Sequence, residues 1–230
     1  MRWRRGADGD DKMNLKRSLR RLLNRNAFAH LYDDAYCRSS LRRLEAQCAG
    51  QSVALVGNAQ SLLEQAQGPA IDGHDVVIRL NRGLIRNPEA QGCRTDMLGL
   101  ACDMSMSEIR HAFGNPTLAW LTPIRELITN DVLATRDSMA FAPVDFWRDL
   151  SRQVGDARPS AGLIMLATLR EFGGCTSIDL YGFDFKHSKT FYHSDERHGR
   201  EGVKRPWHDW SAEESLVQRW VREDKSLKVH

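Results

Sequence analysis

Short apolar runs alternate with helical patterns along this chain, and that alternation leaves few folds open to it. The runs are rich in Val, Ile and Leu, and between them apolar residues recur at helical spacing. Buried strands joined by helices form parallel sheets that are covered on both faces. The pattern therefore predicts an α/β fold, a single Rossmann-like domain with a mostly parallel central sheet flanked by helices. Strands are expected at 52–56, 74–80, 97–101, 118–121 and 178–181, and helices at 39–48, 62–66, 107–112, 124–134, 146–154, 162–171 and 212–222.

The length of 230 residues suits one such domain with a full core. The apolar content of 41% and the charged content of 27% are ordinary for a globular protein. We find no internal repeat and no low-complexity linker. The chain is therefore divided into a polar, disordered N-terminus at 1–12, a basic helical appendage at 13–48 and the domain itself at 49–230.

Basic residues are concentrated near the N-terminus. Leu15, Leu19, Leu22 and Leu23 fall on one helical face with Lys and Arg between them, which indicates a basic amphipathic helix. This helix could pack on the domain through its leucines, or residues 14–25 could lie on an anionic membrane, where each basic residue contributes about 1 kcal/mol. Binding of this basic segment to nucleic acid is the third hypothesis. The net charge of +3 and the lack of a basic strand with interleaved aromatics argue against nucleic acid as a partner.

The cysteine usage predicts a reducing compartment. The five cysteines are odd in number and lack the CxxC spacing of metal sites, which favours free thiols over a disulfide framework. No run of roughly eighteen apolar residues is present, so we expect no transmembrane segment and no signal peptide. The expected location is the cytoplasm, with peripheral contact at the inner membrane face as the alternative.

The first segment with functional potential is the strand that ends in Gly57 and Asn58, and Arg79-Leu80-Asn81 lies beyond it. A strand that runs through a short polar loop into a helix places backbone N–H groups at the carboxyl edge of the sheet, where ligands bind in doubly wound folds. Because there is only one glycine, this is neither a GxGxxG fingerprint nor a P-loop. A plain turn with Asn58 as a helix cap remains open.

Two further segments follow in the second half of the chain. Pro159-Ser160-Ala161-Gly162 precedes an apolar helical stretch, and a helix start of this kind is either an ordinary cap or an anion site. A later strand ends in Leu180-Tyr181-Gly182-Phe183. His208 is then followed five positions on by Glu213, and His193 lies upstream; by itself, such a histidine is more often structural than catalytic.

In this order, the three segments resemble the sialylmotifs of the sialyltransferases, glycosyltransferase family 29. The resemblance implies that 49–230 is a catalytic domain with a variant of the GT-A glycosyltransferase fold. It also implies transfer of sialic acid, or of a related 2-keto sugar acid such as Kdo, from a CMP donor to a glycan hydroxyl. The nucleotide-binding residues that it implies are Gly57, Asn58, Asn81, Ser160, Ala161, Gly162, Tyr181 and Gly182.

The same resemblance assigns the catalytic roles. In the family, the histidine of the last motif is the general base, which corresponds to His208, and an earlier histidine assists the departing phosphate. His193 matches that second place and His187 is its rival. Imidazole suits both tasks because its ordinary pKa lies at about 6.5. Glu213 is expected to support the site, by capping a helix or by fixing the tautomer of His208.

No metal and no cofactor are expected. No Asp-x-Asp follows a strand in the place where a metal-dependent sugar-nucleotide site would have it, and His and Cys are not clustered at ligand spacing. The expected reaction is an inverting transfer whose leaving group carries one phosphate.

The chain departs from the family at two points. Ala161 stands where the family has threonine, so one hydroxyl contact with the donor is missing. Animal members pair the cysteine that corresponds to Cys175 with one at the position of Val53; because Cys48 is distant in sequence from that position, no such disulfide is expected. A nucleotide-binding protein of the same fold without transfer activity is the alternative function.

Overall fold

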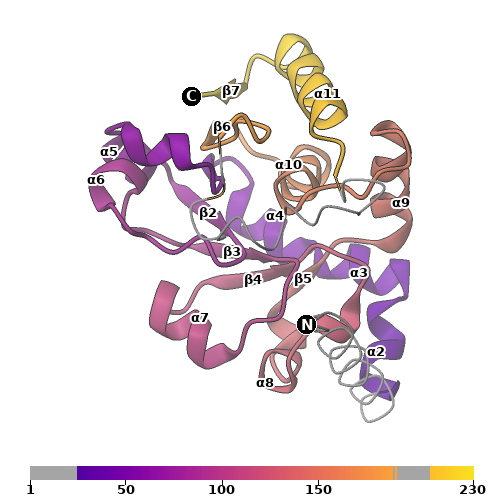
Figure 1. Ribbon diagram of the computed structural model, residues 1–230. Helices are drawn as coiled ribbons and strands as arrows, with labels where there is room; N and C mark the ends of the chain where they lie inside the picture. The colour runs from indigo at the N-terminus through magenta and orange to yellow at the C-terminus, as the bar shows by residue number, and fades with distance from the viewer. Residues whose placement is uncertain (1–24, 189, 191–207) are drawn as a thin grey trace, which may run out of the picture.

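The computed structural model describes residues 25–188, 190 and 208–230. Its centre is a seven-stranded sheet in the order β5-β4-β3-β2-β1-β6-β7, in which every neighbouring pair is parallel (Figure 1). The strands are β1 (Ser52–Val56), β2 (Val76–Leu80), β3 (Met97–Leu100), β4 (Thr117–Trp120), β5 (Ala140–Phe141), β6 (Ser177–Tyr181) and β7 (Leu227–Val229). The predicted α/β fold with a parallel central sheet is confirmed. The two strands that were not predicted, β5 and β7, are the short ones at the edges.

The strand order reverses beside β1. The chain builds β1 to β5 outward on one side and then returns to place β6 and β7 on the other. Val56 lies opposite both Arg79 of β2 and Tyr181 of β6, so these three strands end level with one another. Ligands bind outside the carboxyl ends of the strands at such a switch point.

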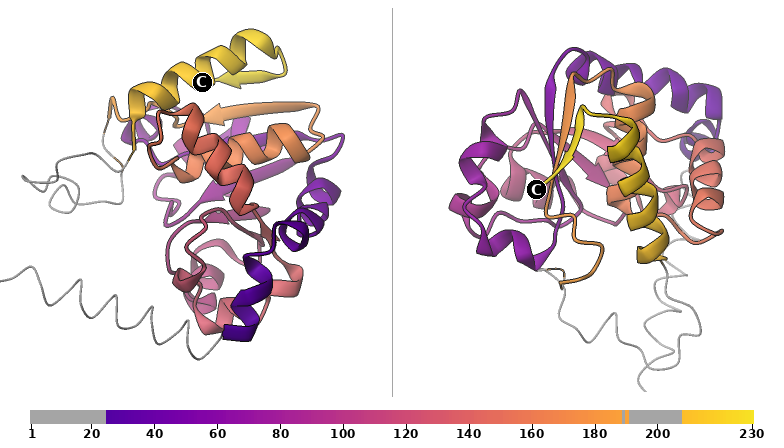
Figure 2. Two further views of the ribbon diagram at one scale, coloured as in Figure 1. Left: turned by 90° about the vertical axis from the view of Figure 1, so that its right-hand side faces the viewer. Right: turned by 90° about the horizontal axis from the view of Figure 1, so that it is seen from above.

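Helices cover both faces of the sheet (Figure 2). Alternate residues of β1 show this, because Val53 and Leu55 pack with α4, α10 and α11, whereas Ala54 and Val56 pack with Ile71 of α5. The α-helices are α2 (Arg25–Leu31), α3 (Asp34–Ser40), α4 (Arg42–Cys48), α5 (Gly68–Asp72), α6 (Pro88–Gln91), α7 (Met106–Phe113), α8 (Asn130–Leu133), α9 (Val144–Gln153), α10 (Ala161–Phe172) and α11 (Trp210–Glu223), and the 3-10 turns are η1 (Gln60–Glu64), η2 (Arg125–Leu127) and η3 (Arg136–Ser138).

Two helix predictions were wrong. The helix expected to begin at residue 62 is the 3-10 turn η1, and the helix expected over 124–134 is divided into η2 and α8. The side chain of Arg125 explains the second division. Its buried guanidinium donates to the carbonyl oxygens of Leu31, Thr122 and Ala142, so this segment is tied to the end of α2 and to the residue after β5.

The described part of the N-terminal segment packs with the sheet. Phe28 and Leu31 of α2, Cys37 of α3, and Leu44 of α4 are buried. Residues 1–24 lie outside the described residues. They include the N-terminus at 1–12 and nearly all of the helix expected from residue 14. Within residues 25–188, 190 and 208–230, no helix combines the length and the apolarity that crossing a bilayer requires.

Cys48 and Cys175 are distant in sequence, but the fold places them near one another. The connection before β1 runs beside the connection before β6, and Gly50 N donates to Gly174 O at 2.9 Å. This brings the two free thiols into hydrogen-bond contact. The hydrogen bond to Cys175, together with burial, raises the pKa of Cys48.

Candidate active site

A cavity of about 220 Å³ opens at the carboxyl edge of the sheet. It lies where β1, β2 and β6 end and where α10 and α11 begin. Most of the residues predicted for the site line this one cavity: Gly57, Asn58, Asn81, Ser160, Ala161, Gly162, Gly182, His208 and Glu213. Tyr181 is not among them, and His193 lies outside the described residues.

Two glycines allow the ends of β1 and β6 to lie close together. Gly57 N donates to Tyr181 O at 2.7 Å, and a Cβ at Gly57 would lie 2.3 Å from Gly182 O. Gly182 has a φ of +68°, in the left-handed region that glycine adopts at little cost. Any larger residue at position 57 would therefore push the two strand ends apart and change the wall of the cavity.

The two predicted asparagines hold the ends of neighbouring strands. Asn58 Nδ2 donates to Leu80 O at 3.1 Å, and Asn81 Oδ1 accepts from Ala101 N at 2.7 Å. Asn81 has a φ of +50°, a conformation that asparagine tolerates better than most residues. Since a carboxamide has two donors and an acceptor oxygen, one such side chain can support the backbone and also contact a ligand.

The first turn of α10 faces the cavity. Ser160 is the N-cap, and its hydroxyl accepts from Leu163 N at 3.1 Å. The next two residues, Ala161 and Gly162, carry first-turn N–H groups that have no carbonyl partner within a helix. A Cβ at Gly162 would lie 2.8 Å from the ring of Phe183, so glycine permits this close packing. Together with the positive end of the helix dipole, the N–H groups suit an anion.

A buried carboxylate joins the starts of α10 and α11. Glu213 Oε1 accepts from Ser160 N at 2.7 Å, and Oε2 accepts from Ser160 Oγ at 2.6 Å. Burial raises the pKa of Glu213 to about 7, against the opposing effect of the two hydrogen bonds from Ser160. Since the single hydroxyl proton of Ser160 is directed at Glu213, Ser160 contributes to an anion site mainly by holding the helix start in place.

Glu213 does not cap α11, which was one of the two roles suggested for it. The cap of α11 is Asp209, whose Oδ1 accepts from Ala212 N at 2.9 Å. The distance from Glu213 Oε1 to His208 Nδ1 is 4.0 Å, longer than a hydrogen bond. The tautomer of His208 is therefore set by another group.

That group is the carbonyl of Arg158, which lies 2.6 Å from His208 Nδ1. A carbonyl can only accept, so in the neutral ring Nδ1 carries the proton and Nε2 carries the lone pair. The ring lies 4.9 Å from that of Trp210, and the side chain is 24% exposed. This arrangement gives a histidine on the cavity wall whose Nε2 can accept a proton.

The other two histidines were candidates for the second catalytic role. His193 lies outside the described residues. His187 is exposed, its Nε2 lies 3.3 Å from Glu214 Oε2, and it does not line the cavity. The geometry therefore gives no support to His187.

The Tyr181 side chain points to the face of the sheet that α5 covers, whereas α10 covers the other face. The ring of Tyr181 is buried with Val56, Ile71 and Val77, and it stacks on His230 at a centroid distance of 4.6 Å. The nucleotide contact assigned to this side chain finds no support in the structure.

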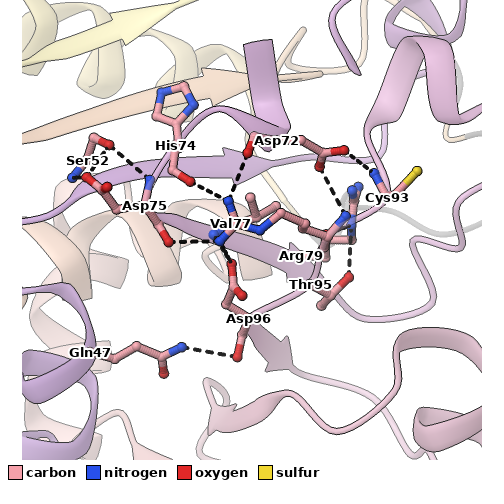
Figure 3. A network of polar contacts seen from close by, with 11 residues as sticks. Gln47, Ser52, Asp72, His74, Asp75, Val77, Arg79, Cys93, Thr95 and Asp96 are labelled. Atoms are coloured by element: carbon pink, nitrogen blue, oxygen red, sulfur yellow. Dashed lines mark hydrogen bonds and ion pairs between the residues drawn. The ribbon is translucent and has the colours of Figure 1, made fainter. Parts of the chain in front are cut away.

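Arg79 and Asp72 belong to a network of polar contacts near the end of β2 (Figure 3). Arg79 is 1% exposed and donates to Arg94 O at 2.9 Å and to Gln91 O at 2.7 Å. Asp72 accepts from the backbone N–H groups of Cys93 and Arg94. These contacts join β2 to the connection that enters β3, and so they fix the end of β2 from which Asn81 extends.

Several residues that line the cavity were not predicted from the sequence: Phe183, Asp184, Phe185, Lys186, Ser188, Thr190 and Trp210. All but Trp210 lie on the loop that follows β6. Their position directly after a strand that ends at the ligand-binding edge was a usable signal. Within the described part of the chain, no group of three or more His, Cys, Asp or Glu side chains is arranged to hold a metal ion.

Comparisons with known proteins place this geometry in context. A family model described as glycosyltransferase family 29 (sialyltransferase) matches residues 24–225. A mammalian sialyltransferase in complex with Gal-beta-1-3GalNAc-ortho-nitrophenol is similar in structure, with a TM-score of 0.54 and 14% identity over 90% of this chain and 85% of that chain. The sialyltransferase Cst-II in complex with CMP, an enzyme of Campylobacter jejuni, has a TM-score of 0.54 and 14% identity over 78% of this chain and 80% of that chain. A search of curated proteins finds no match.

Proposed function

The chain belongs to glycosyltransferase family 29, the sialyltransferases, and we propose that it transfers sialic acid or a related 2-keto sugar acid from a CMP donor to a glycan hydroxyl. The observation that carries this proposal is the assembly of one cavity from both asparagines, the start of α10 and His208. The similar structures with CMP and with a galactose-containing acceptor support a donor and an acceptor of these kinds.

In the proposed reaction, the acceptor oxygen attacks the anomeric carbon from the side opposite the phosphate, so the configuration inverts. The bond from that carbon to the phosphate oxygen breaks, and CMP leaves with the electron pair. His208 Nε2 takes the acceptor's proton, since Nδ1 is held by the carbonyl of Arg158. General base catalysis of this kind is typically worth about 10²- to 10⁴-fold.

The departing phosphate is placed at the first turn of α10. The N–H groups of Ala161 and Gly162 are backbone donors, so the replacement of threonine by Ala161 leaves them in place. Because CMP carries a single phosphate, a helix start and a nearby histidine can stabilise it, and the proposal requires no metal and no further cofactor. His193 keeps its proposed role of assisting the phosphate.

The test is a transfer assay with the purified chain. CMP-sialic acid and CMP-Kdo are offered separately with β-galactoside acceptors in the presence of EDTA, and both released CMP and the sugar product are measured. The proposal predicts a product with one of the two donors. Binding of CMP without release of CMP from either donor would favour the alternative, a nucleotide-binding protein of the same fold. Membrane contact through residues 14–25 also remains a proposal, because nearly all of these residues lie outside the described ones.

A further inference from the structure

One cationic side chain faces the cavity from the loop after β6. Among the described residues that line the cavity, Lys186 is the one lysine or arginine. Its side chain is exposed in part, and desolvation by the surrounding protein lowers its pKa against the opposing effect of the Asp184 carboxylate. A partly desolvated ammonium of this kind gains stability when an anion binds beside it.

The loop holds Lys186 in a strained conformation. Phe185 and Lys186 have φ values of +48° and +71°, and such residues cost roughly 1–3 kcal/mol each unless the surroundings enforce them. Asp184 enforces them here, because it accepts from Lys186 N at 3.1 Å and from Ser188 N at 2.9 Å. Strained backbone on a cavity wall suggests that the position of this side chain serves the site.

The loop is also joined to the segment that follows β1. Asp184 Oδ2 accepts from Ser61 Oγ at 3.1 Å, and Ser61 N donates to Ser188 Oγ at 3.2 Å. Ala59 and Thr190 form an isolated antiparallel bridge. The wall that carries Lys186 is therefore fixed to the same segment that carries Asn58.

Contacts of the ammonium place it on the His208 side of the cavity. Lys186 Nζ donates to Thr190 Oγ1 and lies 5.6 Å from the centroid of the Trp210 ring. That ring in turn lies 4.9 Å from the ring of His208. The Trp210 ring thus lies near both the cation and the histidine to which we assign the base role.

We propose that Lys186 binds the carboxylate of the donor sugar and thereby selects acidic sugars. This inference rests on the proposed function. The carboxylate is attached to the carbon that the acceptor hydroxyl attacks, so it must lie near the base that contacts this hydroxyl. The phosphate is assigned to the first turn of α10, whereas Asp184 and Glu213 on the cavity wall would repel a second anion unless a cation offset them.

The deciding experiment measures the affinities of CMP and of the CMP-sugar acid separately. Lys186→Met keeps the length of the side chain and removes its charge. We expect CMP to bind within about twofold of wild type, whereas KM for the CMP-sugar acid should rise roughly 10- to 100-fold, as expected for loss of a charged hydrogen bond. Lys186→Arg should recover most of this loss. Lys225→Met, on the exposed loop before β7, is the matched control.

A second arm requires no variant. A donor analogue whose carboxylate is replaced by a carboxamide should bind wild type more weakly by a similar factor, and Lys186→Met should not distinguish it from the acid. An equal loss of CMP and donor affinity in Lys186→Met would assign Lys186 to the phosphate and overturn the inference. An unchanged KM for the acid, or equal wild-type affinity for acid and carboxamide, would overturn it as well. Absence of CMP binding and of transfer in wild type would instead count against the proposed function.

Discussion

Single residues determine whether this cavity can catalyse transfer. The sequence predicted which residue types line the cavity better than it predicted the directions in which their side chains point. Asn58, Asn81 and His208 were predicted as site residues and line the cavity. The Tyr181 side chain instead points to the face of the sheet that α5 covers. The alternation of side chains along a strand explains this difference, because Ile178 and Leu180 of β6 pack on the α10 side. No sequence motif includes Lys186, and its place on the cavity wall depends on the conformation of the loop after β6.

The first prediction concerns His208. Replacing it with alanine should lower kcat by about 10²- to 10⁴-fold, because the acceptor proton loses its base, and should leave CMP affinity nearly unchanged. Steady-state kinetics and a CMP titration measure the two quantities. His187→Ala is the control, since this exposed histidine does not line the cavity. Wild-type kcat in the His208 variant would remove the assignment.

The second prediction concerns the pH dependence of stability. The pKa of Glu213 is raised to about 7 from the ordinary value of 4.5, so the folded protein binds this proton more tightly than the unfolded chain does. The stability contributed by this group is therefore present at low pH and is lost as the pH rises through the window from 4.5 to 7. Between about pH 5 and about pH 8, wild type should lose up to about 3 kcal/mol relative to Glu213→Gln.

Urea unfolding at a series of pH values measures this difference. Glu214→Gln changes the neighbouring, more exposed carboxylate of the same helix and should leave the slope as it is in wild type. If the free energy of unfolding depended on pH in the same way for wild type and Glu213→Gln, the pKa of the buried Glu213 carboxylate would not be raised in the folded protein.

Among the elements, the first turns of α10 and α11 do the most to shape the site. Ser160 and Asp209 cap these helices, and the carboxylate of Glu213 joins them. The sequence indicated the start of α10, because Ser160 before an apolar helical stretch is a local signal, whereas α11 begins two residues before the expected start at residue 212. The link between them could not be predicted, since it depends on tertiary packing over 53 positions of sequence.

The third prediction compares two helix caps. Ser160→Ala should lower the free energy of unfolding by about 1–3 kcal/mol, because a cap is lost and the buried Glu213 loses a donor. It should also weaken CMP binding, because the helix start moves. Ser105→Ala removes the exposed cap of α7 and should cost about 1 kcal/mol with no effect on CMP. Thermal unfolding and CMP titration of both variants measure these effects, and equal CMP affinity in the two would contradict the role of α10.

For the whole molecule, the alternation of strands and helices predicted the fold class, and the order of the motifs predicted the family that the comparison confirms. The order of the strands was not predictable from local patterns, because it depends on which strands pair. β5 and β7 contain too few residues to give a periodic signal. The contact between Cys48 and Cys175 likewise follows from the pairing of β1 with β6.

The central claim is that the nucleotide and the base share the cavity at the switch point of the sheet. A crystal structure of the chain with CMP and an acceptor glycan tests it most directly. We expect the phosphate within about 3 Å of the N–H groups of Ala161 and Gly162, and an acceptor hydroxyl within about 3 Å of His208 Nε2. CMP bound away from Asn58 and Asn81, or an acceptor hydroxyl out of reach of His208, would contradict the account.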